Sequence, residues 1–508
     1  MNKIQEIFKA WNIAFDPNQQ QSELASKRIE ICNSCDKKVT NLGVNRCSVC
    51  GCALKGKVFS PVENACPEGK WKNIDKEYFN KEKIMSNFSY TITKDDTIFI
   101  QIASYRDPQL IPTLDDLFSK AKYPDNIKVC IAWQHSDKDK WDNVDKYKDD
   151  SRVSILDIPY KQAKGACWAR NKIQQEYNGE RYTLQLDSHH RFIKNWDLEL
   201  IYMYQKLRNK GVDKPLLTSY ISSFNPENDP EDRGVEPWWM TFDRFTPEGV
   251  VFFLPAGVPD WKTRNEPIKG RFYSAHFAFT AGEFSTEVQH DPQFYFHGEE
   301  ITIGVRAFTH GYDIYHPHKI IAYHEYTRKG RTKHWDDSSD WTQLNTNTHK
   351  LTRELLGIDG QVNEEYRKGK YGFGSSRTLQ EYERYAGIRF NDRGVQQYTL
   401  SNKIPPNPEV EDYNNSFFSK FKHCLDVHKN DFPEDDYSFA AVIFEDKDGK
   451  QIFRKDLTAG EIKSMKKSDN EWMNIWREYT GPIPHQWIVW PHSESKGWGN
   501  KITTVLNG

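Results

Sequence analysis

Residues 181–192 read RYTLQLDSHHRF, an apolar run that ends in Asp187, Ser188 and His189. A short apolar run bounded by charged residues is typical of a buried β-strand. An acidic residue and an imidazole two positions apart can face the same side of an extended loop, and together they suit a divalent cation. Asp187 and His189 are therefore candidate metal ligands. The alternative is that they cap the strand or lie in a solvated loop.

Similar runs lie on both sides of this strand and alternate with amphipathic segments. The apolar runs are DTIFIQIASYRD (96–107), NIKVCIAWQHS (126–136), SRVSILDIPY (151–160) and KPLLTSYISSF (214–224), and the amphipathic segments are PTLDDLFSKAKY (112–123), ACWARNKIQQEY (166–177) and WDLELIYMYQKL (196–207). This alternation predicts an α/β fold with a mostly parallel sheet and helices on both faces. Ligands of such sheets bind at the carboxyl ends of the strands. No G-x-G-x-x-G or Walker sequence follows the first strand, which argues against a dinucleotide or P-loop fold.

The composition excludes several classes of protein. The 508 residues include 70 Lys and Arg against 72 Asp and Glu, a formal net charge of −2, which excludes a strongly basic polynucleotide coat and a disordered acidic chain. The mean hydropathy is −0.82, and no stretch approaches the roughly 20 apolar residues of a membrane helix. The start MNKIQEIFKAW lacks the apolar core of a signal peptide. We therefore expect a protein that works in the cytoplasm and has no membrane partner.

Six of the nine cysteines lie in the first 70 residues. Cys32 and Cys35 form one C-x2-C knuckle, Cys47 and Cys50 form a second, and 11 residues separate the knuckles. This spacing is typical of a zinc ribbon, in which four thiolates surround one structural Zn2+. Cys52 and Cys66 leave open a different set of four ligands, and a cluster of free thiols is the simpler alternative.

Several motifs follow one another in a characteristic order. They are YRDP (105–108), ARN (169–171), DSH (187–189), FHGEE (296–300) and AYHEY (322–326). This order looks like a nucleotide-sugar glycosyltransferase of the A fold. The segments 98–124, 168–197, 274–326 and 371–390 resemble the cytoplasmic N-acetylglucosaminyltransferase family, whose members include an enzyme that modifies a hydroxyproline on a ubiquitin-ligase subunit. The resemblance covers neither the cysteine segment nor the last hundred residues.

The resemblance implies a retaining transfer of a sugar, GlcNAc above all, from a UDP-sugar to an acceptor hydroxyl on a protein, a glycan or a modified nucleotide. It implies Mn2+ (or Mg2+) bound by Asp187, His189 and His324. It makes Glu299 and Asp187 the candidate catalytic residues, with the Glu299 carboxylate at the sugar or the acceptor hydroxyl. The residues that it places near the nucleotide or the sugar are Ser104, Tyr105, Arg106, Asp107, Arg170, Asn171 and Ser188.

Some of these residues have simpler explanations. His324 can be a hydrogen-bonded histidine beside the core, and Asp107 can cap the helix that Pro108 begins. Glu300 fits a carboxylate at a helix start. Trp238, Trp239 and Trp261 lie where an acceptor groove would form, or they build a hydrophobic lid. His276 and Asp291 lie in the matching motifs and have no assigned role.

The last part of the chain has a different pattern. Residues 402–416 are rich in Pro, Asn and acidic residues, which is typical of a linker. After them, two alternating runs around DKDGK predict a hairpin, and Trp487, Trp490 and Trp498 either bind a glycan or pack in a small β-sandwich. We expect a helix over 1–28, a zinc-ribbon-like module over 29–75, a catalytic domain over 90–400, a linker over 401–416 and a β-rich accessory domain over 417–508.

The expected function is thus a metal-dependent UDP-sugar glycosyltransferase. One alternative is a protein that binds glycans or nucleic acid on a transferase fold without turnover. A second is a transferase that acts on modified DNA bases. The near-neutral net charge weighs against the second alternative, because DNA-binding proteins usually carry basic surfaces.

Overall fold

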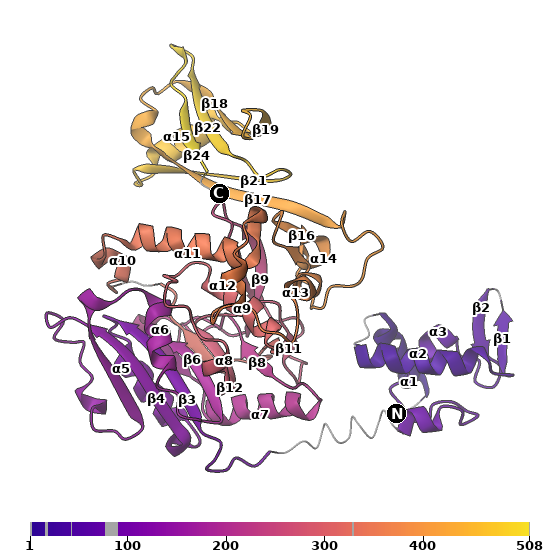
Figure 1. Ribbon diagram of the computed structural model, residues 1–508. Helices are drawn as coiled ribbons and strands as arrows, with labels where there is room; N and C mark the ends of the chain where they lie inside the picture. The colour runs from indigo at the N-terminus through magenta and orange to yellow at the C-terminus, as the bar shows by residue number, and fades with distance from the viewer. Residues whose placement is uncertain (1–2, 16–18, 42, 77–89, 328–329, 507–508) are drawn as a thin grey trace. The chain divides into compact units, whose positions relative to one another are not determined.

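The structure is a computed structural model that describes residues 3–15, 19–41, 43–76, 90–327 and 330–506 (Figure 1). It divides into two compact units, Met1–Tyr90 and Thr91–Gly508, and each is described by itself.

The first unit begins with two helices where we expected one helix over residues 1–28. They are α1 (Lys3–Phe15) and α2 (Gln19–Asn33), and α2 continues past the expected boundary to include Cys32. The sequence between them contains Pro17, which lacks the N–H that a helix interior needs. A hairpin of β1 (Lys38–Asn41) and β2 (Val44–Cys47) follows, and then the short helix α3 (Leu54–Lys57).

A buried ion pair ties the first unit together. The Arg28 Nε lies 2.8 Å from the Asp75 Oδ1, and both side chains are fully buried. The Arg28 guanidinium also donates to the carbonyls of Val58 and Ser60 and lies 4.7 Å from the Trp71 ring centre. These contacts satisfy most of the charge that burial would otherwise penalise.

The second unit is built around an eight-stranded mixed sheet in which six strands run in the same direction and two run against them, close to the mostly parallel sheet that we expected. In spatial order its strands are β11 (Ile268–Lys269), β13 (Asp313–His316), β8 (Pro215–Thr218), β12 (Phe277–Ala281), β6 (Tyr182–Asp187), β3 (Ile98–Tyr105), β4 (Ile127–His135) and β5 (Val153–Pro159). The strands β6, β3, β4 and β5 are parallel, whereas β12 runs antiparallel between β6 and β8, and β11 runs antiparallel to β13. Apolar content predicts that a strand is buried but not its direction.

Helices cover this sheet, and β3 is buried on both faces. Successive residues Ile98, Phe99 and Ile100 point to opposite faces, and all three are buried. On one face Phe99 packs with Ala169 and Ile173 of α6. The helices of this unit before its C-terminal sheet are α5 (Leu110–Lys120), α6 (Ala166–Gln174), α7 (Trp196–Asn209), α8 (Phe284–Glu287), α9 (Glu299–Thr309), α10 (His334–Asp337), α11 (Trp341–Leu356), α12 (Glu364–Lys368), α13 (Leu379–Ala386) and α14 (Gln397–Leu400).

A small two-stranded ribbon lies at the carboxyl end of β6. Its strands are β7 (His190–Phe192) and β14 (Ala322–His324), which pair antiparallel with His324 opposite His190. The ribbon therefore brings the motif AYHEY beside the motif DSH, although more than 130 residues separate them in the sequence.

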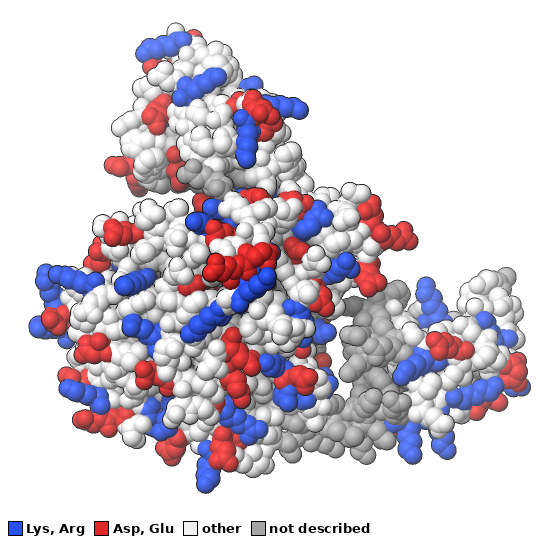
Figure 2. All heavy atoms as spheres, in the orientation of Figure 1, with Lys and Arg blue, Asp and Glu red and all other residues white. Residues whose placement is uncertain are grey.

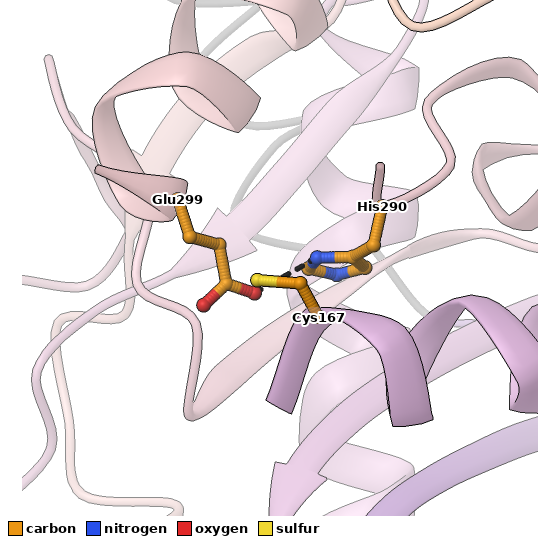
Figure 3. Close-up of side chains that lie close together, drawn as sticks. All are labelled: Cys167, His290 and Glu299. Carbon is orange, nitrogen blue, oxygen red and sulfur yellow. Dashed lines mark ion pairs between the residues drawn. The ribbon is translucent and has the colours of Figure 1, made fainter. Parts of the chain in front are cut away.

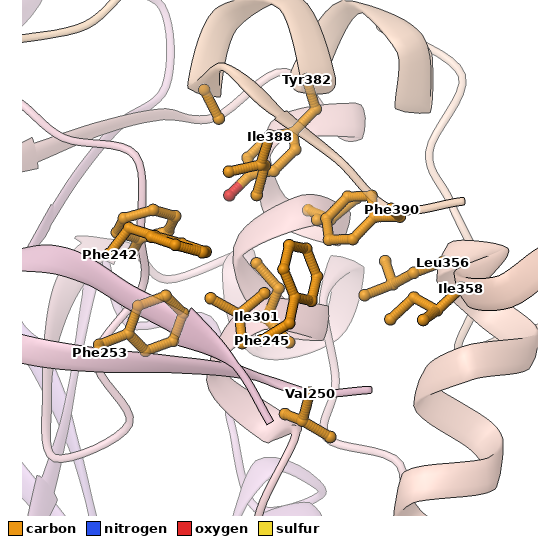
Figure 4. Close-up of a cluster of buried hydrophobic side chains, with 14 of the residues drawn as sticks. Phe242, Phe245, Val250, Phe253, Ile301, Leu356, Ile358, Tyr382, Ile388 and Phe390 are labelled. Atoms are coloured by element: carbon orange, nitrogen blue, oxygen red, sulfur yellow. The ribbon is translucent and has the colours of Figure 1, made fainter. Parts of the chain in front are cut away.

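A second sheet contains β10 (Val251–Gly257), β9 (Trp238–Phe245), β17 (Phe417–His428), β16 (Gly394–Gln396) and β15 (Ile388–Arg389), and β21 (Trp472–Thr480) pairs with β17. Its buried face packs on α9 and α13 and forms an aromatic core (Figure 4). In this core Phe390 is fully buried, with ring centres of Phe245 and Tyr382 at 6.3 and 6.2 Å.

We expect Phe390→Ala to lower the free energy of unfolding by about 3–5 kcal/mol, because it removes a fully buried ring and leaves a cavity. Urea denaturation followed by tryptophan fluorescence measures this loss. Phe418→Ala is the control, since Phe418 is 43% exposed and should cost less than about 1 kcal/mol. Equal losses for the two variants would contradict the assigned core.

The C-terminal residues form the predicted hairpin and a third sheet. The strands β18 (Tyr437–Glu445) and β19 (Gln451–Arg454) are antiparallel, and β18 also pairs with β22 (Gln486–Ser493). The remaining elements are β20 (Leu457–Thr458), α15 (Ala459–Lys467), β23 (Gly497–Trp498) and β24 (Ile502–Val505). Residues 401–416, all described, contain no helix or strand. The strand β17 that follows them pairs with β16 and β9 in the second sheet, and its residues Phe421, Leu425 and Val427 pack in the core of the C-terminal sheet.

Candidate metal and nucleotide site

The structure brings Asp187, His189 and His324 together at the end of β6. One ligand-type atom from each lies within 4.8 Å of the others. The Asp187 Oδ2 is 3.3 Å from the His324 Nε2 and 3.7 Å from the His189 Nε2. Two imidazoles and one carboxylate form a donor set that suits a divalent cation such as manganese.

Asp107 fixes the orientation of His189. Its Oδ2 lies 2.7 Å from the His189 Nδ1, so the opposite ring nitrogen is left facing Asp187. A metal-ligating histidine usually has such a carboxylate partner on its other nitrogen. The Asp107 Oδ2 also accepts from the Ser188 Oγ at 2.7 Å and from Arg331 at 3.1 Å. Although burial alone would raise it, these contacts hold the pKa of the Asp107 carboxyl well below its usual range.

The other oxygen of Asp107 caps the following turn. The backbone N–H of Gln109 donates to the Asp107 Oδ1 at 2.8 Å, but α5 begins only at Leu110 with Gln109 as its N-cap residue, so Asp107 does not cap the helix as the alternative expected. Both carboxylate oxygens are thus engaged by protein groups, and the side chain is 3% exposed. Asp107 and Ser188, which were predicted beside the nucleotide, instead lie behind the candidate metal ligands, where Asp107 orients His189 and Ser188 donates to Asp107.

Arg170 links Asp187 to Glu299. One terminal nitrogen of Arg170, NH2, donates to the Asp187 Oδ1 at 2.7 Å, and the other, NH1, lies 2.6 and 2.8 Å from the two carboxylate oxygens of Glu299. The two oxygens of Asp187 therefore have different partners: Oδ1 contacts Arg170, and Oδ2 faces the two imidazoles. Burial would raise the pKa of Glu299, but Arg170 and His290 lower it to about 2.

The predicted nucleotide residues at the end of β3 differ in accessibility. Ser104 is fully buried. The Tyr105 hydroxyl and the Arg106 guanidinium both donate to the Asp337 Oδ2 at 2.7 Å. Arg106 also donates to the Asp139 Oδ2 at 2.6 Å. Burial, together with the hydrogen bond to Asp337, raises the pKa of the Tyr105 hydroxyl above its usual range.

Asn171 and the other motif residues lie around the same region. The Asn171 side chain donates to the His290 carbonyl at 2.7 Å, which ties α6 to the loop before α9. Asp291 accepts from the Tyr366 hydroxyl at 2.8 Å, and Glu300 accepts from the Tyr220 hydroxyl at 2.6 Å. Burial raises the pKa of Glu300 to about 7.

Aromatic side chains line one side of the metal-ligand cluster. The rings of His276 and Tyr326 each lie 4.3 Å from the His324 ring. The Trp238 ring lies 5.9 Å from that of Tyr326, so this tryptophan belongs to the same aromatic group. Trp239 and Trp261 instead belong to a separate apolar cluster with Val258.

Arg331 and Tyr326 were not among the predicted site residues. Arg331 contacts Asp107 and also lies 2.8 Å from the Glu325 carboxylate. It lies outside every motif, and nothing in the sequence marked it. Tyr326 ends the motif AYHEY and was visible there as a residue two positions after His324.

Five of the N-terminal cysteines line one pocket: Cys32, Cys35, Cys47, Cys50 and Cys66. Tight turns form both knuckles, because the Cys35 N–H donates to the Cys32 carbonyl and the Gly51 N–H donates to the Cys47 carbonyl. Cys52 does not line this pocket. Burial and the neighbouring thiols raise the pKa of Cys32 to about 11, so a metal would have to displace a tightly held proton.

The cysteine sulfur atoms of the first unit lie farther from one another than the ligand atoms of Asp187, His189 and His324 do. Within the described residues, metal-ligand atoms lie within 4.8 Å of one another in two groups, and both groups are in the second unit. A zinc ion in the first unit would therefore have to draw the two knuckles closer together.

None of the helices in the described parts of the chain is both long and apolar enough to cross a membrane.

In the C-terminal sheet the three tryptophans divide between the two faces. Trp487 is 4% exposed and packs in the core of this sheet. Trp490 and Trp498 lie on the opposite face with ring centres 4.3 Å apart, and Trp498 is 44% exposed. Of the two alternatives left open for these tryptophans, Trp487 therefore fits packing within the sheet, because its ring is buried.

Comparison with known proteins identifies the class. The profile of the family described as Glycosyltransferase (GlcNAc) matches residues 97–151 and 141–392, which is more than half of the chain. The chain belongs to this glycosyltransferase family. A search of curated proteins found no match.

The solved structures that match this chain are distant. They include GalNAc-T7 with UDP, GalNAc and Mn2+, which is 13% identical over 81% of this chain and 72% of that one, with a TM-score of 0.42. Residues 1–349 of TarS from S. aureus, in complex with UDP-GlcNAc, are 14% identical over 54% of this chain and 78% of that one, with a TM-score of 0.31. The mannosyltransferase PcManGT from Pyrobaculum calidifontis, with GDP-Man and Mn2+, is 11% identical over 50% and 66%, with a TM-score of 0.31.

Proposed function

We propose that this glycosyltransferase moves GlcNAc from UDP-GlcNAc to an acceptor hydroxyl with retention at the anomeric carbon and with Mn2+ or Mg2+ as cofactor. The observation that carries the proposal is the cluster of Asp187, His189 and His324 at the carboxyl end of β6, in a chain of this family. The burial of His189 and His324 and the Asp107 contact to His189 fit a site that holds a metal rather than a solvated loop.

The residues of the site have distinct tasks in this proposal. Asp187, His189 and His324 hold the cation, which supplies positive charge beside the leaving diphosphate. Tyr105 and Arg106 bind the nucleotide at the end of β3. The aromatic group of His276, Tyr326 and Trp238 shields the reacting side of the sugar from water and contacts the acceptor. The leaving phosphate accepts the proton of the acceptor hydroxyl on the same face of the sugar. The protein mainly positions the reactants and stabilises charge.

A panel of UDP-sugars with Mn2+ tests the function. We expect UDP release to be fastest with UDP-GlcNAc, and mass spectrometry of candidate proteins, glycans and modified nucleotides then identifies the acceptor. If none of the UDP-sugars in the panel gives UDP release, the alternative of a binding protein without turnover is favoured. Transfer to modified DNA alone would favour the alternative of a transferase that acts on DNA bases. Figure 2 gives this alternative little support, because basic and acidic side chains are interspersed on the described surface that it draws.

We also propose that the cysteine pocket of the first unit holds one structural Zn2+. The ligands come from Cys32, Cys35, Cys47 and Cys50, with Cys66 as the competing fourth thiol because it lines the same pocket. A small module of this size gains stability from a metal that its limited core cannot supply.

Arg106→Ala should weaken UDP binding by at least about tenfold, because a charge-assisted hydrogen bond contributes about 1.5–3 kcal/mol. Titration calorimetry with UDP and Mn2+ measures the affinity. Arg152→Ala is the control, since Arg152 pairs with Asp150 before β5, away from the end of β3. Unchanged UDP affinity in a folded Arg106→Ala variant would show that the nucleotide binds elsewhere.

A further inference from the structure

Cys167, His290 and Glu299 form a second buried cluster next to the metal-ligand residues (Figure 3). Cys167 lies in the first turn of α6, Glu299 is the first residue of α9, and His290 lies in the loop between α8 and α9. One ligand-type atom from each lies within 4.8 Å of the others, and all three residues are buried. The combination of thiol, imidazole and carboxylate also occurs at metal sites.

Arg170 makes this cluster a poor cation site. Its NH1 nitrogen lies within 2.8 Å of both Glu299 oxygens, so the carboxylate is already neutralised by a fixed positive charge. A metal ion on the same oxygens would lie beside that guanidinium, and the repulsion between like charges is strong in a buried site. The Glu299 carboxylate therefore forms an ion pair with Arg170 and is not available to a second metal ion.

His290 lies next to the Glu299 carboxylate as well. The His290 Nδ1 lies 2.8 Å from the Glu299 Oε1, and the His290 Nε2 lies 2.6 Å from the Gln185 Oε1. Gln185 is itself oriented by donating its amide N–H to the Ala275 carbonyl at 2.6 Å. A chain of contacts thus runs from the sheet through Gln185, His290 and Glu299 to Arg170 and Asp187.

We propose that Glu299 and His290 are positioning residues that set the metal affinity of Asp187 through Arg170, and that Glu299 does not contact the sugar. The inference rests on the proposed function for the identity of the metal site. Arg170 holds the Asp187 Oδ1, which leaves the Oδ2 directed at His189 and His324. Glu299 balances the charge of Arg170, so that Arg170 does not neutralise Asp187.

Charge counting gives the direction of the effect. Asp187 and Glu299 each contribute −1 and Arg170 contributes +1, so the group has a net charge of −1 when the imidazoles are neutral. In Glu299→Gln the net charge becomes zero, and Arg170 has Asp187 as its only carboxylate partner in the group. A divalent cation then competes with Arg170 for Asp187.

The test measures Mn2+ binding directly, with and without UDP, by electron paramagnetic resonance. Glu299→Gln should weaken Mn2+ binding by about tenfold or more, the usual effect of losing a group that supports a metal ligand. At saturating Mn2+ its turnover should stay within about threefold of the unmodified protein, a barrier change of less than about 1 kcal/mol. Glu300→Gln is the matched control: Glu300 contacts Tyr220 and the Ala275 N–H but not Arg170, and its substitution should leave Mn2+ affinity unchanged.

His290 variants provide a second line of evidence in case Glu299→Gln fails to fold. His290→Asn retains a polar side chain next to Glu299, whereas His290→Leu does not, so Mn2+ affinity should fall more in His290→Leu. Unchanged Mn2+ affinity in Glu299→Gln with lost turnover at saturating Mn2+ would overturn the proposal and make Glu299 a catalytic residue. A bound metal that disappears in Cys167→Ser would overturn it in favour of a second metal site. Failure of the proposed function appears differently, as Mn2+ binding that does not change in Asp187→Asn.

Discussion

Asp187→Asn should reduce Mn2+-dependent UDP release by at least about a hundredfold, which corresponds to roughly 2.7 kcal/mol of lost transition-state stabilisation. The change removes the charge from the metal-ligand cluster while nearly preserving its shape, so the cation and the diphosphate beside it lose their strongest protein anchor. The Arg170 contact loses its ion-pair character at the same time. The measurement is UDP release against Mn2+ concentration, with the melting temperature recorded for the same sample.

The control for this prediction is Asp157→Asn. Asp157 also lies near the end of a parallel strand, β5, but its side chain is 69% exposed and pairs with His135. Its substitution should leave UDP release within about twofold, because an exposed ion pair contributes about 1 kcal/mol or less. Near-normal release by Asp187→Asn would remove the metal assignment and with it most of the proposed mechanism.

Zinc in the first unit has the second largest expected effect. Cys47→Ser should abolish stoichiometric zinc and unfold the unit, because structural zinc contributes an apparent 10–16 kcal/mol or so in small modules at neutral pH. Elemental analysis of protein purified without chelator gives the stoichiometry, and limited proteolysis reports the unfolding of residues 1–90.

Cys52→Ser is the matched control, since Cys52 does not line the cysteine pocket. It should retain zinc and resist proteolysis as the unmodified chain does. Cys66→Ser decides whether the fifth thiol is a ligand. An unmodified protein that carries no stoichiometric zinc would contradict the whole assignment.

The sequence predicted the parts of the site that depend on local pattern. The apolar run before Asp187 forms β6, as predicted, and Asp187 and His189 lie two positions apart where this strand ends. The later histidine, His324, came from the family resemblance, and the structure explains its position by the pairing of β14 with β7. Each of these features can be predicted from the end of one strand and one short motif.

The contacts that span the chain could not be predicted in this way. Arg170 and Glu299 are 129 residues apart, and nothing in either segment specifies that one guanidinium bridges two carboxylates. The prediction of Asp107 as a nucleotide residue considered its position after β3 but not the approach of Arg331, 224 residues later. The direction of β12 was also missed, because burial sets which residues are apolar and not which way a strand runs.

The two helices of the first unit and the position of Trp487 show a different limit. Pro17 was visible in the sequence, yet the amphipathic spacing of Ile4, Ile7 and Trp11 favoured a single helix. In β22 the side chains alternate between the faces, so Trp487 and Trp490 had to lie on opposite sides, but the sequence did not tell which side would be covered. Only the packing against the rest of the sheet decides that.

The strand β17 makes the C-terminal residues part of the scaffold rather than an appendage. Its first three residues pair with β16, the rest of the strand pairs with β21, and Phe421 also pairs with Phe245 of β9. A protein shortened before Phe417 would expose the edge of β16 and uncover Phe245, which belongs to the aromatic core beneath α9. An open strand edge is prone to pair with other chains. If the protein is divided into separately produced parts, the boundary should therefore lie near Tyr90. A cut in residues 401–416 would instead produce a fragment that is prone to aggregate.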